Sequence, residues 1–100
     1  MTNAVLFSAL GDSTRLEIVR RLSTGVPHTI STVSSGLEMS RQGIRKHLQI
    51  LAEANIIRLQ PKGRDTSVQL ERQTLEQART FIAELIRPST IPVINSGRAT

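Results

Sequence analysis

The spacing of apolar and polar residues predicts a short amphipathic helix over residues 40–51. Ile44, Leu48 and Leu51 follow one another at spacings of four and three, which places them on one side of a helix. Ser40 stands at its start, where the hydroxyl can accept a hydrogen bond from a backbone N–H two or three residues later. The opposite side carries arginine, glutamine and lysine. We therefore expect one buried face and one face of long donors and acceptors.

The apolar residues of a first helix, predicted over residues 3–10, exceed what one buried face requires. Ala4, Phe7 and Leu10 are expected to face inward. This leaves Val5 and Leu6 over. Surplus apolar residues on a terminal helix often contact a second subunit. We therefore expect Val5 and Leu6 to lie in a dimer interface.

A second helix is predicted to begin at Asp12 or Ser13, because both residue types cap helix N-termini well. It is expected to end near Gly25. Leu16, Val19 and Leu22 line one of its faces, and Ile18 is expected to help fill the core.

A helix-turn-helix is predicted from the residues that follow. Residues 28–30 are short and extended, and a small helix is expected over residues 31–35. A turn over residues 37–39, with Leu37 and Met39 pointing into the core, leads to the helix at residues 40–51. A short helix, a turn near a glycine and a second, capped helix are typical of this motif.

Beyond residue 55 the period of the pattern changes from helical to two. Apolar and polar residues alternate over residues 57–60 and again over residues 67–70, which predicts an antiparallel hairpin. Residues 61–65 supply proline and glycine for the turn, with Lys62 and Arg64 at its tip. The predicted fold is mainly α with a small β-hairpin, a winged helix-turn-helix with the order α-α-(β)-α-α-β-β-α.

A last helix is predicted over residues 72–87 and carries a narrow apolar seam. The seam consists of Leu75, Ala78, Ile82 and Leu85. Such a seam could cover the core of its own domain, but we favour a dimer interface shared with the first helix. The expected organisation is one DNA-binding domain with dimerisation helices, residues 1–87, and a mobile tail without periodicity, residues 88–100.

Composition narrows the class of protein. One hundred residues suit a single domain, and the absence of cysteine excludes disulfides and thiolate metal sites. No signal peptide or membrane-spanning run is recognised, so a cytoplasmic protein is expected. No pair of nucleophile and base, metal cluster or phosphate-binding glycine loop is evident. We expect neither an enzyme nor a bound cofactor.

The net charge of +5 is concentrated in one quarter of the chain. Residues 40–64 contain six basic residues and one acidic residue, whereas the remainder contains seven of each. The six are Arg41, Arg45, Lys46, Arg58, Lys62 and Arg64. A charged run is more often just a solvated surface. Because this run coincides with the amphipathic helix and the hairpin, it favours a surface that binds a polyanion.

Three segments of the chain resemble the ArsR/SmtB-type winged-helix repressors of prokaryotes. They are residues 9–18, residues 39–51 and the pair Gly63 and Arg64 in the wing, and the resemblance covers residues 4–87. It implies a homodimer built on the first and last helices. It also implies that the two recognition helices read an imperfect inverted repeat in a promoter.

The expected contacts with double-stranded DNA lie on the recognition helix and the wing. The resemblance implies Ser40, Arg41, Gln42, Arg45, Lys46 and Arg64, and the polar pattern adds Gln49 and Lys62. Arginine pairs well with guanine and glutamine with adenine in the major groove, so Arg41 and Gln42 are the candidates for base readout. We expect the other basic residues to contact phosphates or the minor groove.

The chain departs from metal-sensing members of that family. It has no cysteine in the helix before the turn and no histidine in the last helix, so no metal site is expected. His47 is expected on the helix surface or against a phosphate. Asn55 replaces the glycine usual after the recognition helix, but asparagine tolerates a left-handed conformation.

The function that these expectations favour is a sequence-specific, DNA-binding transcriptional regulator, a dimeric repressor of an inverted-repeat operator. The alternative is a winged-helix module whose basic face binds an acidic protein. RNA is disfavoured, because a helix does not fit the A-form major groove and aromatic residues are scarce. The operator, the regulated genes and any effector are left open.

Overall fold

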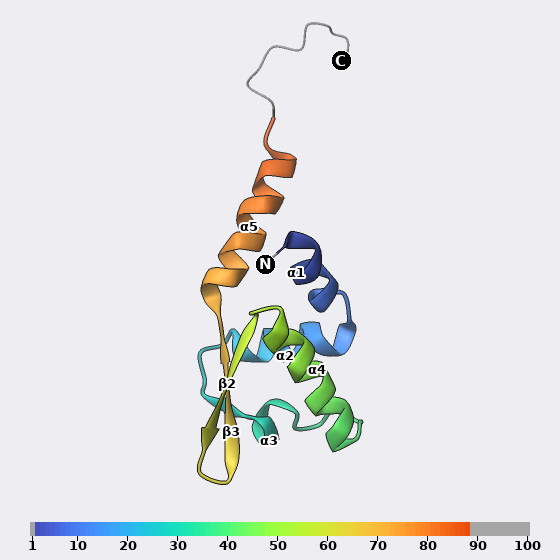
Figure 1. Ribbon diagram of the computed structural model, residues 1–100, viewed down its shortest axis with the longest axis vertical. Helices are drawn as coiled ribbons and strands as arrows, with labels where there is room; N and C mark the ends of the chain where they lie inside the picture. Colours follow the sequence, from blue (N-terminus) through green and yellow to red (C-terminus); the bar gives the residue numbers. More distant parts are fainter. Residues whose placement is uncertain (1, 89–100) are drawn as a thin grey trace, which may run out of the picture.

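The computed structural model describes residues 2–88, which form helices around a small antiparallel sheet (Figure 1). The elements are α1 (Asn3–Leu10), α2 (Ser13–Leu22), β1 (His28–Thr29), α3 (Ile30–Val33), α4 (Arg41–Glu53), β2 (Ile57–Lys62), β3 (Asp65–Leu70) and α5 (Arg72–Ile86). This order confirms the predicted winged helix-turn-helix. The predicted tail lies outside the described residues apart from Pro88.

Polar side chains cap the starts of α2 and α4. The Ser40 hydroxyl accepts a hydrogen bond from the Gly43 backbone N–H at 3.0 Å, as the sequence predicts. The Asp12 carboxylate accepts from the Arg15 backbone N–H at 3.0 Å at the start of α2. Each cap satisfies a backbone N–H that has no partner within its helix.

The sheet has the strand order β1-β3-β2, with antiparallel pairing throughout. Ile57 lies opposite Leu70 and Leu59 lies opposite Val68, so the predicted apolar positions share one face. The strands run further toward the tip than predicted, because Pro61 pairs within β2. Proline is tolerated there because β2 is an edge strand, where a missing N–H costs little.

The hydrophobic core lies between α2, α3, α4 and the sheet. Its fully buried side chains include Ile18, Val33, Leu48, Leu51 and Ile56. The stripe predicted on α4 is confirmed, since Ile44 is also buried. α4 packs against α2 and β2 along this stripe, which leaves its other face exposed.

The chain leaves α4 through a left-handed residue. Asn55 has a φ of 60°, and the backbone N–H of Ile56 then donates to the Leu51 carbonyl oxygen at 2.9 Å. Asparagine therefore takes the conformation that glycine would favour, as predicted. The turn directs the chain into β2 beside the helix it has just left.

The predicted inward face of α1 is wrong at Ala4, while Leu10, also expected to face inward, is partly buried against the core. Leu6 and Ala9 are the buried residues, whereas Ala4 is exposed and Phe7 is half-buried. α1 packs against α5, α2 and α4, so it is covered from more than one direction. The Phe7 ring also meets the Phe81 ring of α5, with centroids 5.6 Å apart.

Two smaller expectations about the core are also wrong. Leu16 is 51% exposed, because Ile18 and Leu22 form the buried side of α2. Met39 is 38% exposed, since Leu37 alone of the two apolar turn residues packs against the core. Met39 instead lies beside the start of α4.

α5 leaves the sheet and extends away from the hairpin, with α1 beside it (Figure 1). Its first half is covered, since Ala78 is buried and Leu75 is partly buried. Ile82, Leu85 and Ile86 are 46%, 68% and 76% exposed. None of the helices in residues 2–88 is long and apolar enough to cross a membrane.

Candidate nucleic-acid interface

The start of α4 and the tip of the hairpin lie at the same end of the molecule (Figure 1). All eight residues predicted to contact DNA are exposed. They do not form one uniform surface, however. The recognition helix has a side that faces the hairpin and a side that faces solvent.

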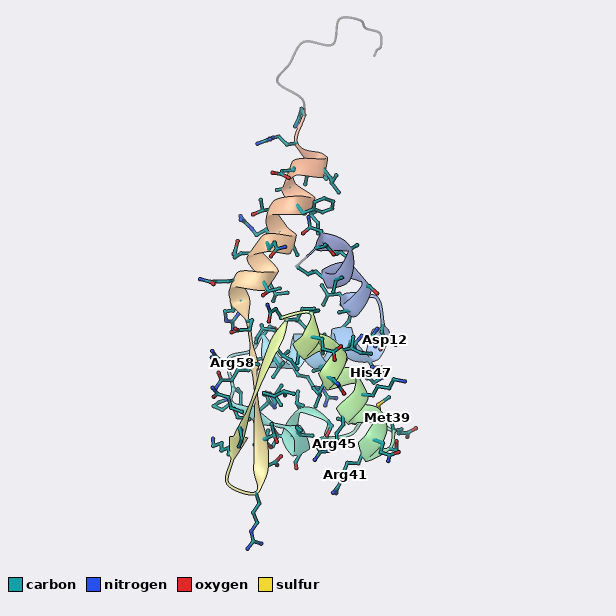
Figure 2. The ribbon with its side chains drawn as sticks, viewed as in Figure 1. Asp12, Met39, Arg41, Arg45, His47 and Arg58 are labelled. Atoms are coloured by element: carbon teal, nitrogen blue, oxygen red, sulfur yellow. The ribbon has the colours of Figure 1, made fainter. Side chains whose placement is uncertain are left out.

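Three arginines from the two elements line one hollow. Arg41 and Arg45 belong to α4, and Arg64 belongs to the loop between β2 and β3. The floor includes Ser31 and Ser34 of the α3 region. Figure 2 shows Arg41 and Arg45 on the side of α4 that faces α3 and the wing. The fold therefore brings together in this hollow cations that are up to 23 positions apart in the chain.

Gln42, Lys46 and Gln49 lie on the solvent side of α4, opposite the buried stripe. The Gln49 amide nitrogen donates to the Glu53 carboxylate at 3.1 Å. Gln49 is thus already engaged by an acidic neighbour one turn further along. Gln42 and Lys46 lie closer to the start of the helix. Each directly follows an arginine that lines the hollow, Arg41 and Arg45 respectively.

The wing is tied to the helix-turn-helix by Asp65. Its carboxylate accepts from the Ser31 hydroxyl at 2.8 Å and from the Thr66 backbone N–H at 2.7 Å. The bond from Thr66, followed by the bond from Ser31, lowers the pKa of Asp65. Asp65 also lines the arginine hollow, but its charge is shared with these donors. Sequence reasoning missed this tie because the two residues are 34 positions apart.

Arg21 holds α3 against α2. Its guanidinium donates to the backbone oxygens of Val33 and Ser35, at 3.0 and 2.7 Å, and to the Glu17 carboxylate at 3.0 Å. Glu17 also accepts from Arg20, and these two arginines lower its pKa to about 2. The end of α3 is therefore fixed by a side chain that the sequence pattern did not single out.

Besides Lys46 on the solvent side of α4, two further cations of the basic segment, Arg58 and Lys62, do not line the hollow. Arg58 donates to the Gln69 side chain at 2.8 Å across the hairpin, and Figure 2 shows it on the side away from α4. Lys62 lines a different depression, which includes His28 and Arg72. Of the predicted contacts, Arg41, Arg45 and Arg64 therefore share one hollow, whereas Lys62 lines a separate depression.

His47, expected on the helix surface or against a phosphate, is half-buried on the side of α4 that faces α2. Its side chain is 20% exposed and faces Asp12 and Arg15 at the start of α2 (Figure 2). Among residues 2–88, no group of three or more His, Cys, Asp or Glu side chains comes together.

Of the residues predicted for a dimer interface, Leu6 and Ala78 are buried within the single chain. Both therefore have almost no surface left for a second copy of the chain. Val5, Ile82 and Leu85 remain exposed, and Leu75 is partly buried. The apolar surface at this end is therefore shifted toward the far half of α5.

These features define a class of protein. A helix with a buried stripe follows a short helix and a turn, and a two-stranded wing lies beside its exposed, basic side. This arrangement is that of a winged helix-turn-helix protein.

Comparison with known proteins gives the family. A family model described as a helix-turn-helix domain matches residues 10–60. The HTH-type transcriptional regulator Rv2034 of Mycobacterium tuberculosis is 34% identical over 74 residues, 74% of this chain and 68% of that protein. The chain belongs to the ArsR-type helix-turn-helix transcriptional regulators, and it is a DNA-binding regulator of transcription.

Solved structures agree with this family. The crystal structure of the ArsR family transcriptional regulator RHA00566 superposes with a TM-score of 0.77 at 28% identity, over 82% of this chain and 89% of that one. An ArsR-like transcriptional regulator from Rhodococcus sp. RHA1 gives a TM-score of 0.70, also at 28% identity, over 82% and 76%. The resemblance inferred from the sequence is confirmed.

Proposed function

We propose that this chain is a dimeric, sequence-specific repressor that acts in the cytoplasm and binds an inverted-repeat operator. The observation that carries the proposal is the hollow shared by Arg41, Arg45 and Arg64. Guanidinium groups bind phosphates and guanine edges in bidentate geometry, and a recognition helix with a neighbouring wing can use both.

Within this proposal, the contacts divide by position. Arg41 and Gln42 stand in the first turn of α4 and read base edges, because residues near the start of a recognition helix reach deepest into the major groove. Arg45, Lys46 and Arg64 contact the sugar-phosphate backbone of the DNA. Ser40 and Gln49 flank this set, and Lys62 approaches the backbone from the other side of the wing.

Two copies of the domain associate through the far half of α5 and the exposed side of α1. Val5, Ile82, Leu85 and Ile86 support this step, since a soluble monomer rarely leaves such a group of large apolar side chains uncovered. Two-fold symmetry of the protein then requires a two-fold arrangement of half-sites in the operator. Residues 1–87 are the proposed functional domain.

Selection of bound duplexes from a random DNA pool tests the proposal. We expect an inverted repeat whose half-sites lie about 10 base pairs apart, or a multiple of that. A salt titration of the selected duplex should show a steep fall in affinity, because each neutralised phosphate releases counterions. Enrichment of no sequence would favour the other candidate, a basic module that binds an acidic protein.

A further inference from the structure

A polar cluster joins α1, α2 and the recognition helix at the side of the molecule away from the wing (Figure 2). The Arg15 guanidinium donates through Nε to the Ala9 carbonyl oxygen of α1 at 2.6 Å. Its terminal nitrogen lies 3.0 Å from Nδ1 of His47 in the middle of α4. One side chain of α2 thus bridges the end of α1 and the helix that carries the DNA contacts.

The donor and acceptor roles in this cluster are fixed by chemistry. A guanidinium can only donate hydrogen bonds, so in this contact Nδ1 of His47 is the acceptor. Asp12 completes the arrangement, since its carboxylate accepts from the Arg15 backbone N–H and lies 3.8 Å from the same Nδ1. The bond from Arg15 lowers the pKa of Asp12, which keeps this acid ionised beside the guanidinium.

The cluster is screened from water more than the DNA-facing side chains are. His47 and Asp12 keep 20% and 35% of their side-chain surface, and the Arg15 contacts are partly buried. A hydrogen bond from a charged group in such a setting is stronger than one at the exposed surface. Arg15 and His47 bond to each other on the side of α4 away from the wing and do not line the arginine hollow, so neither is counted among the proposed DNA contacts.

We propose that Arg15 and His47 are positioning residues for operator binding, which set the orientation of α4 relative to α1. The inference rests on the proposed function, in which α1 belongs to the dimer interface and α4 reads a half-site. In such a dimer, the angle between α1 and α4 determines the distance between the two recognition helices. The Arg15–His47 bond therefore selects the spacing of the half-sites rather than their sequence.

Two substitutions of His47 separate this role from simple packing. His47→Asn places an amide oxygen where Nδ1 stands, so the acceptor for Arg15 is kept. His47→Leu fills a similar volume without an acceptor, so the terminal nitrogen of Arg15 loses this bond while Nε keeps its bond to the Ala9 oxygen. The full chain is tested in each case on three duplexes: the selected operator, the same operator with one base pair inserted between its half-sites, and a random sequence.

We expect His47→Leu to lose about tenfold in affinity for the operator, and to keep its affinity for random duplex within about twofold. Its discrimination against the one-base-pair insertion should fall by a similar factor. His47→Asn should stay within about threefold of the wild-type chain on all three duplexes. Arg15→Lys should behave like His47→Leu, because one ammonium group cannot reach both the Ala9 oxygen and Nδ1.

Thermal unfolding of the same variants excludes a general loss of structure. A parallel loss of affinity for all three duplexes, in step with a lower Tm, would overturn the inference. So would equal losses in His47→Asn and His47→Leu, because the acceptor would then be irrelevant. If the wild-type chain shows no preference for half-site spacing, both the proposed function and this inference are wrong. A wild-type preference that His47→Leu leaves intact overturns this inference alone.

Discussion

The α4–wing end and the α1–α5 end of the molecule expose different kinds of side chain. At the wing, the exposed groups are mainly cations, and polar bonds such as the one between Ser31 and Asp65 hold the backbone beneath them. At the other end, Ile82 and Leu85 are exposed apolar groups on a helix that extends from the body. A surface of the first kind suits a hydrated polyanion, and one of the second kind suits a dry contact with protein.

The difference teaches how one small domain can support two interactions without interference. Both ends are built on the same core, in which the α4 stripe packs against α2 and β2. Affinity for DNA depends on salt because counterions are released, whereas burial of apolar surface is much less sensitive to salt. Changes at the two ends should therefore have separable effects.

The largest effect is expected from charges placed in the exposed half of α5. Ile82→Asp combined with Leu85→Asp should abolish the proposed dimer, because two carboxylates would have to be buried. Operator affinity should then fall by about 100-fold or more, because the two recognition helices no longer bind their half-sites as one linked unit. Light scattering measures the oligomeric state, and a binding titration measures the affinity.

A matched control lies on the same helix. Thr80 is exposed and falls on the side of α5 opposite Ile82, so Thr80→Asp adds a carboxylate without touching the apolar surface. It should leave both the mass and the affinity unchanged. A double variant that still has the mass and operator affinity of the wild-type chain would show that this surface is not the interface.

The next largest effect is expected at the start of α4. Arg41→Ala should cost about 1–3 kcal/mol on the operator and relax the preference at one base pair, because a bidentate contact with a base edge is lost. Repeating the duplex selection with the variant measures both. A loss that is equal on operator and random DNA would assign Arg41 to the backbone and leave Gln42 to account for base readout.

The sequence predicted the recognition end more accurately than the other end, for a physical reason. α4 packs its core-facing side and leaves the rest exposed, so its buried residues recur with a helical period. The hairpin follows its period of two less closely, since Ile57 and Val68 are buried but Leu59 is 36% exposed. α1 is covered from several directions, so Leu6 was assigned to a partner although it is buried within the chain.

The contacts that orient the recognition elements could not be predicted from the pattern. Arg15 and His47 are 32 positions apart, and Ser31 and Asp65 are 34 apart. Periodicity describes which face of an element is buried, but it does not say which polar groups of two elements meet. The candidate DNA contacts were accessible to sequence reasoning because charge accumulates within residues 40–64.

A smaller, sequence-independent effect is expected at the wing. Arg64→Ala should weaken binding to operator and random duplex alike and reduce the slope of the salt dependence by about one. Lys62→Ala should act in the same direction but more weakly, because Lys62 lines a separate depression. Arg58→Ala is the matched control, since Arg58 is engaged with Gln69 away from α4. An equal loss in the Arg58 variant would mean that only net charge matters.

The smallest effect is expected from Asp65→Asn, and it should depend on pH. The carboxylate accepts from Thr66 and Ser31, so the pKa of Asp65 is lowered in the folded chain. A lowered pKa stabilises the fold above the ordinary pKa of aspartate, and that contribution is lost as the pH falls through the lowered value. The Tm of the variant should lie slightly below that of the wild-type chain at neutral pH, and the two should converge in acid.

Ser31→Ala provides the comparison that assigns this effect to the tie between wing and helix-turn-helix. It removes the hydroxyl donor and leaves the Thr66 bond in place, so it should reproduce part of the Tm difference at neutral pH. Both variants should lose a few-fold in operator affinity, since Arg64 is then held less firmly beside α4. A Tm difference that persists unchanged at acid pH would mean that the ionised carboxylate of Asp65 does not stabilise the wing.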